Sequence, residues 1–206
     1  MNKEKDNEVI SFTDYEEKTK SSASQYLLTQ MFMVNGNHQK VFMMIHGNNG
    51  QENGRAHSII GLALPYLLNL LGGKTGAPPM ANVQSLWIYA VDSFDYHSCE
   101  SVLSKQLRQA VERMNKQISL TEEEEVMYLN WCTAEVEKKS VAIVSNQQRG
   151  YYQLAACLIL SLAELWAGRG KRAEGFNFIQ KYHQKYHRHR SFRQELTNAT
   201  LKSGIF

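Results

Sequence analysis

The side chains best suited to acid–base chemistry lie in the segment DSFDYH. Asp92 and Asp95 are paired carboxylates, and His97 follows two residues later. Carboxylates beside an imidazole can move a proton during catalysis. The same residue types are equally suited to ending one element and capping the next helix. A catalytic role would need a pocket that also gathers His46 and His57.

A second motif is VFMMIHGNNG, from Val41 to Gly50, in which an apolar run leads into a His-Gly loop. It resembles the strand and loop that supply an oxyanion-hole amide in α/β-hydrolases. Such a hydrolase also needs a serine in the pattern G-x-S-x-G, and no serine of this chain lies in that pattern. A small hydrolase-like enzyme is therefore only a further alternative, and we predict a non-enzymatic protein.

The sequence predicts neither a phosphate loop nor a metal site. In a Walker A reading of GGKT, Gly72–Thr75, the required glycine four residues earlier is replaced by Leu68. Structural zinc usually takes four ligands in close pairs such as C-x₂-C. Cys99 and Cys132 are far apart, and neither they nor His97 show that spacing. We therefore predict no metal and no cofactor.

The strongest charge signal is the basic stretch from Gly168 to Arg193, where Glu174 is the single acid. We predict that its eight cations form a partner-binding basic face. They are Arg169, Lys171, Arg172, Lys181, Lys185, Arg188, Arg190 and Arg193. Tyr182, Tyr186 and Phe192 interleave with them, and rings among cations can stack bases while the cations neutralise phosphates. Helical spacing also places the tyrosines on a packing face, so nucleic-acid binding, docking of an acidic protein and a solvated face all remain open.

Composition bounds the class of protein. The chain has 206 residues, 43% of them hydrophobic and 21% charged, which suits one domain with a buried core. A net charge of +3 is too small for whole-surface attraction to nucleic acid or to a membrane. Three scattered cysteines and an N-terminus without an apolar segment favour a cytoplasmic protein. The most apolar run, Ile59–Leu71, is too short for a bilayer, so we expect no membrane insertion.

The first half of the chain predicts a small antiparallel sheet. Two apolar runs, at about 26–34 and 40–46, flank an Asn35-Gly36 turn signal typical of a hairpin. A helix is the alternative for the first run, because Leu and Met favour helices. LWIYAV, residues 86–91, is aromatic and β-branched and predicts a third strand. With the helices that follow, the expected fold class is α+β, a three-stranded sheet packed against a larger helical layer.

Helical periodicity dominates the rest of the chain. Thr121 followed by Glu124 is a capping-box signature, and the glutamates Glu122–Glu125 suit the positive end of a helix dipole. These glutamates indicate a solvated helix start, with an acidic docking face as the alternative. The predicted helices cover 56–71, ended by Gly72-Gly73, a face over 103–118, the helix after Thr121, 150–167 and Ala173–His187. We expect 1–22 to be a mobile tail and 23–206 one compact domain, with a hairpin, helix and strand in 23–95 and mostly helix in 96–206.

Two resemblances add to this interpretation. The segment from Tyr151 to Tyr186, two helices joined by a GRGKR turn, is similar to a degenerate tetratricopeptide-type hairpin and covers under a fifth of the chain. In size and general character the chain also resembles the small cytosolic adaptors of bacterial type IV secretion (Dot/Icm) coupling complexes. That resemblance implies a role in assembly, and no residues are carried over from it.

We therefore predict a protein–protein interaction module, an adaptor or chaperone-like assembly subunit. Eight methionines suit an adaptable contact surface. The apolar helix could complete its burial against a helix of a partner. Its candidate contact residues are Ile59, Leu62, Leu67 and Leu70. A nucleic-acid-binding accessory factor that uses the C-terminal basic helix is the alternative.

Overall fold

The computed structural model describes residues 25–47, 59–73, 80–92, 105–107, 109 and 118–206. Helices make up 85% of this part of the chain, and no strand occurs in it. The predicted α+β class is therefore wrong, and the protein is helical. The predicted tail, 1–22, and most of the predicted helical face over 103–118 lie outside the described residues.

The predicted hairpin at Asn35-Gly36 is a connection between two helices. Residues 25–34 are helical, and α2, His38–Gly47, follows. Gly36 has a φ of 70°, and the backbone bonds Asn37 N→Phe32 O (2.8 Å) and Gly36 N→Met33 O (3.1 Å) form a Schellman cap. Asn37 then caps α2, because its Oδ1 accepts from Lys40 N at 3.2 Å. A tight hairpin turn and this double cap need the same positive φ, so the local signal could not separate them.

The third predicted strand, 86–91, lies inside α4, Ala81–Asp92. The buried side chains of α4 recur at helical spacing and include Val83, Leu86, Trp87, Ala90 and Val91. Ile88 and Tyr89, between them, are about half exposed, at 52% and 44%. A stripe of period 3.6 therefore outweighs the local β propensity of LWIYAV.

The predicted apolar helix is confirmed where the structure describes it, as α3, Ile59–Gly72. It is buried along almost its whole length, including Pro65 and Asn69. A helix that is apolar all round belongs at the centre of a core. The buried polar side chain of Asn69 forms a hydrogen bond within its own helix, because its Nδ2 donates to Pro65 O at 2.9 Å.

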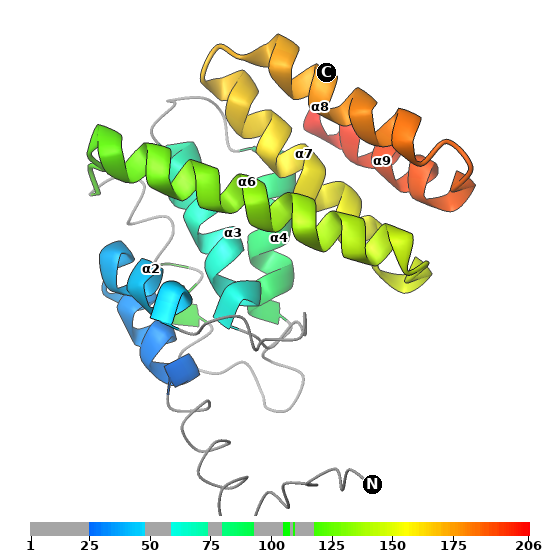
Figure 1. Cartoon of the computed structure of the whole chain (residues 1–206). Coiled ribbons are helices and arrows are strands. Elements are labelled where there is room, and N and C mark those ends of the chain that lie inside the picture. Colours follow the sequence, from blue (N-terminus) through cyan, green and yellow to red (C-terminus); the bar gives the residue numbers. More distant parts are fainter. Residues whose placement is uncertain (1–24, 48–58, 74–79, 93–104, 108, 110–117) are drawn as a thin grey trace, which may run out of the picture.

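The predicted capping box is also confirmed and starts α6, Glu122–Ser145. Glu124 N donates to Thr121 Oγ1 at 3.2 Å, and Thr121 N donates to Glu124 Oε2 at 2.9 Å. The 24 residues of α6 span about 36 Å at 1.5 Å per residue. This long helix crosses in front of α3 and α4 (Figure 1).

The remaining helices form a compact trio on one side of the molecule (Figure 1). They are α7, Tyr152–Gly168, preceded by the short 3₁₀ turn η3, Arg149–Tyr151; α8, Arg172–Lys185; and α9, Arg190–Ser203. The helical hairpin predicted from the sequence is α7 with α8, joined through Gly170 at a φ of 76°. The sequence interpretation did not anticipate α9.

The core is organised around α7, which packs against α3, α4, α6, α8 and α9. One hydrophobic cluster runs from Met33 near the start of the described chain to Leu196 in α9. None of the helices within the described ranges combines the length and the apolar character that a bilayer span requires.

Candidate functional site

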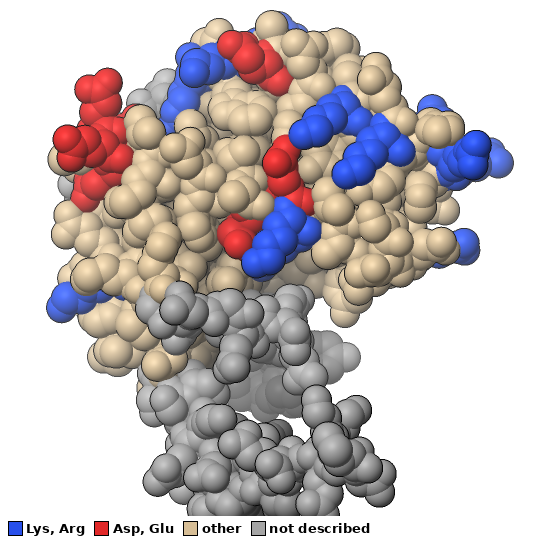
Figure 2. Space-filling model, viewed as in Figure 1, with Lys and Arg blue, Asp and Glu red and all other residues tan. Residues whose placement is uncertain are grey.

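The most distinctive surface is a group of cations where α8 turns into α9. Lys185, Arg188, Arg190 and Arg193 are all exposed there, and we call these four residues the cationic tip. Basic side chains gather at this end of the molecule in Figure 2, beyond the right-hand end of α6. The sequence contains no acidic residue between Glu174 and Glu195, so the whole turn is free of carboxylates.

Buried aromatic rings hold the cationic tip in place. Tyr182 and Tyr186 stack on α8 with centroids 6.2 Å apart, and Phe192 of α9 meets Tyr186 edge-on at 5.6 Å. Phe192 also contacts Tyr152 of α7, at 5.7 Å. The Tyr186 hydroxyl lies 3.3 Å from Ser145 Oγ at the end of α6. Four elements therefore meet beneath the turn, and its cations stand on a rigid base.

These rings are core residues rather than a stacking platform. Tyr182, Tyr186 and Phe192 expose 2%, 5% and 0% of their surface. The sequence pattern of aromatics among cations left base stacking open, and that use would require the rings to be accessible. The helical spacing of these rings therefore reflects their packing in the core.

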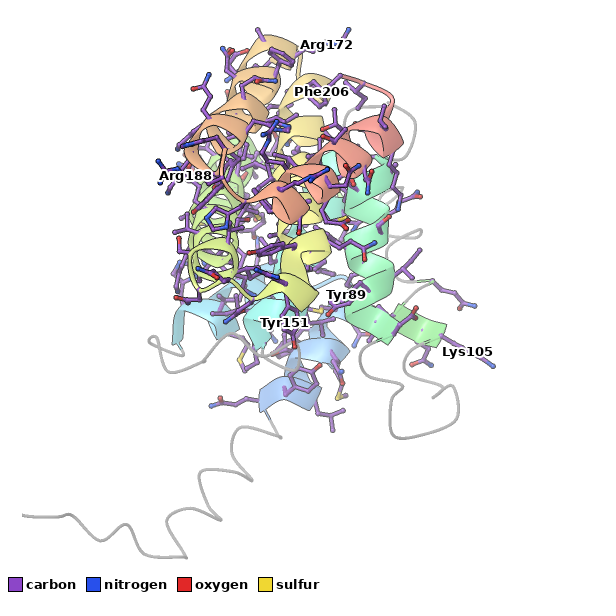
Figure 3. All side chains as sticks on the ribbon, turned by 90° about the vertical axis from the view of Figure 1, so that its right-hand side faces the viewer. Tyr89, Lys105, Tyr151, Arg172, Arg188 and Phe206 are labelled. Carbon is purple, nitrogen blue, oxygen red and sulfur yellow. The ribbon has the colours of Figure 1, made fainter. Side chains whose placement is uncertain are left out.

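The other four predicted basic residues lie elsewhere. Arg172 lies at the opposite end of α8 from Arg188 (Figure 3), with the exposed Lys171 just before it. Lys181 is paired, with its Nζ 2.9 Å from Glu137 Oε1. Arg169 is half-buried and donates to the backbone oxygen of Leu71 at 3.1 Å. The eight cations are therefore one cluster in the sequence and several separate groups in space.

The predicted apolar docking residues all lie in the core of this chain. They expose between 0% and 3% of their surface, and they are Ile59, Leu62, Leu67 and Leu70. Helices α2, α4, α6 and α7 pack around α3. Burial of this helix therefore needs no partner.

The acidic start of α6 lies at the far end of that helix from the cationic tip (Figures 1 and 2). Glu122 and Glu123 are exposed, whereas Glu124 belongs to the capping box and accepts from Gln39 Nε2 at 2.7 Å. Because Tyr186 contacts the last residue of α6, the two charged ends are separated by about the full length of that helix.

A buried carboxylate that sequence reasoning missed lies where α4 begins. Glu164 of α7 is fully buried and accepts from Asn82 Nδ2 at 2.7 Å, and from the backbone N–H groups of Asn82 and Val83 at 3.1 and 3.4 Å. Burial raises the pKa of Glu164, and these hydrogen bonds oppose the rise. Asn82 Nδ2 also donates to Ala199 O in α9, at 3.1 Å. Glu164 is the single charged residue between Arg149 and Arg169, which is the sequence signal that could have marked it.

Glu164 and Arg169 form hydrogen bonds with backbone groups at the ends of two other helices. Glu164 covers the first N–H groups of α4, and Arg169 covers a last carbonyl of α3. An acid at a helix N-terminus and a base at a C-terminus both match the helix dipole. The two side chains therefore fix the α3 and α4 ends against α7, which is a structural role.

A second polar contact joins α2 to α6. His38 Nδ1 lies 2.9 Å from the Tyr128 hydroxyl. Burial lowers the pKa of His38, with Glu124 opposing the shift, and burial raises the pKa of Tyr128 to about 12. Both shifts favour the neutral form of the side chain, as expected of an internal hydrogen bond.

The residues considered for catalysis are not brought together in the described chain. His46 Nδ1 lies 3.1 Å from its own helix at Phe42 O, and Asp92 ends α4. His57, Asp95, His97 and Cys99 fall outside the described residues. Within the described part of the chain, no three His, Cys, Asp or Glu side chains cluster in a way that could hold a metal ion.

The two described cysteines are free thiols, Cys132 and Cys157. Burial raises the pKa of Cys132, and it raises the pKa of Cys157 to about 11. A nucleophilic cysteine needs a lowered pKa and some exposure. These thiols therefore serve as small packing groups.

The surface thus offers a cationic tip on a rigid aromatic base, with an acidic helix start far from it. No family of known proteins, no curated protein and no solved structure matches the chain, so its own side chains carry the functional argument.

Proposed function

We propose that the chain is a non-enzymatic protein–protein interaction module whose cationic tip binds an acidic segment of a partner. An adaptor or assembly subunit is the class of protein that this activity suits. The supporting observation is the uncompensated charge of the tip. Lys181 and Lys138 are paired with Glu137 and Glu135, at 2.9 and 3.3 Å. By contrast, no ion pair within the described chain involves Lys185, Arg188, Arg190 or Arg193.

An acidic protein segment suits this surface better than a nucleic acid does. The rings that would stack bases are buried beneath the tip, so only phosphate contacts are left to the nucleic-acid alternative. Exposed ion pairs contribute about 0.2–1 kcal/mol each. Four such pairs support weak and salt-sensitive binding, in which charge mainly guides encounter and orientation.

The proposal is tested by titrating the protein with an octa-aspartate peptide and measuring the chemical shifts of the backbone amides. We expect shifts centred on the α8–α9 turn. The double variant Arg188→Gln/Arg190→Gln should weaken binding by roughly two- to thirtyfold, because two pairs at about 0.2–1 kcal/mol each are lost. Neither side chain makes a hydrogen bond that the fold needs, unlike Arg193, which donates to His187 O at 3.3 Å.

The matched control is Lys40→Gln/Lys171→Gln, which removes the same charge from an exposed site on α2 and from the exposed residue before α8, at the opposite end of that helix from the tip. It should bind like the wild type. Equal loss in both double variants would mean attraction to net charge and would contradict the proposal. A dT12 oligonucleotide that binds at the tip far more tightly than the peptide, with a steep salt dependence, would favour the nucleic-acid alternative.

A further inference from the structure

Three histidines lie among the cations of the tip. His183 lies on the last turn of α8, and His187 and His189 lie in the turn to α9. Imidazole is the side chain whose charge ordinarily changes between pH 5 and 8. The tip therefore combines four permanent positive charges with three that depend on pH.

All three imidazoles are exposed or half-buried at the cationic tip. His187 is exposed, and its Nδ1 lies 3.2 Å from Gln184 O. His189 is half-buried and meets the Tyr186 ring edge-on at 5.4 Å. His183 is half-buried, and the positive charge of Arg193 on α9 acts on it electrostatically. Burial lowers the pKa of His183, and Arg193 lowers it further, so His183 takes up a proton at a lower pH than an ordinary imidazole does.

Few carboxylates on the surrounding elements can offset this charge. On α6, Glu137 is already paired with Lys181. η3 contributes the cation Arg149, and α7 contributes the buried phenol of Tyr152. α9 carries Glu195, half-buried one turn beyond Phe192. Protons taken up by the three imidazoles therefore add to the charge of the tip.

We propose that the cationic tip is a pH-tuned docking surface, on which protonation of His183, His187 and His189 strengthens the hold on an acidic partner. This inference rests on the proposed function of the tip and adds its regulation. Each imidazole that gains a proton adds one charge to the four permanent ones. The peptide affinity should rise roughly three- to tenfold, the gain expected from one or two additional exposed ion pairs.

The test is titration of the full chain with octa-aspartate at pH 7.5, 6.5 and 5.5 at fixed ionic strength. Aspartate, with an ordinary pKa of about 3.9, stays ionised over this range, so the peptide adds little pH dependence of its own. The variant His183→Gln/His187→Gln/His189→Gln should bind with nearly constant affinity. His187→Gln alone, which changes one exposed ring, should lose part of the dependence and covers the case in which the triple variant does not fold. His46→Gln, an exposed histidine on α2, is the control and should keep the wild-type profile.

The outcomes separate the two proposals. Wild-type affinity that does not change with pH, or a pH profile that survives in the folded triple variant, overturns the pH-tuned surface and leaves the docking proposal standing. Failure of the peptide to bind at any of the three pH values overturns the docking proposal itself.

Discussion

Gly175 in α8 sets two common rules of helix stability against each other. Helix propensity alone predicts that Gly175→Ala stabilises the protein by about 1 kcal/mol. In the folded chain, however, a Cβ at this position would lie 2.8 Å from the backbone oxygen of Ala163 in α7 and 3.1 Å from the Phe206 ring. A ring can turn aside, but a carbonyl within a buried helix cannot. The added methyl group must therefore separate α8 from α7.

The magnitude follows from the two opposing effects. Overpacking a close contact costs about 1–3 kcal/mol, and the upper part of that range applies where backbone blocks the new atom. After the propensity gain is subtracted, Gly175→Ala should destabilise the protein by about 1–2 kcal/mol. For a chain of this size that corresponds to a fall in Tm of roughly 2–8 °C.

Urea unfolding followed by circular dichroism at 222 nm measures this difference. Gly150→Ala is the matched control, because a Cβ there meets nothing within 4 Å. It should leave stability unchanged or raise it by up to about 1 kcal/mol. If the Ala163 oxygen is the obstacle, Phe206→Ala should not rescue Gly175→Ala. A Gly175→Ala protein as stable as the wild type would refute the close α7–α8 contact.

Three further predictions concern the polar contacts. Glu164→Gln mimics the protonated carboxyl group. In the wild type the folded-state pKa of Glu164 is raised, so the contribution of Glu164 to stability is complete below its unfolded pKa of 4.5 and is lost as the pH rises through the folded-state pKa. The variant should therefore gain on the wild type as pH rises in urea titrations from pH 4.5 to 7.5, and the reverse trend would mean that the hydrogen bonds to Glu164 outweigh its burial. His38 has a lowered folded-state pKa, so its contribution is present above the unfolded value of 6.5 and is lost as the pH falls. Between pH 7.5 and 5.5 the wild type should lose more stability than His38→Gln, and equal losses would exclude this effect. Arg169→Met removes the bond to Leu71 O and should cost about 1–2 kcal/mol in thermal or urea unfolding, whereas Lys171→Met, an exposed neighbour, should cost almost nothing; equal effects would argue against the cap.

Signals that act within one helix turn were read correctly from the sequence. The Thr121 and Glu124 pair predicted the start of α6, and the glycines after Trp166 predicted the break between α7 and α8. Sequence patterns that are compatible with two different local structures did not decide between them. The Asn35-Gly36 turn suits a hairpin and a Schellman cap alike, and LWIYAV reads as a strand until its buried neighbours upstream in α4, such as Val83, are counted.

The candidate site shows the same division. The cations of the tip could be found from sequence because they lie within nine residues of one another. Their separation from Arg172 could not, because it depends on the length and direction of α8. Likewise Glu164 and Asn82 lie 82 positions apart, and only the packing of α4 on α7 brings them together.

The length of α6 has a consequence for how a partner meets this protein. Its acidic start and the cationic tip lie about 36 Å apart, several times the screening length of about 8 Å at physiological salt. The two ends therefore do not neutralise each other, and the net charge of +3 describes neither. A charged partner senses a single end, and only when it is already close. Ionic strength then sets the capture radius of each end and the orientation in which an encounter begins.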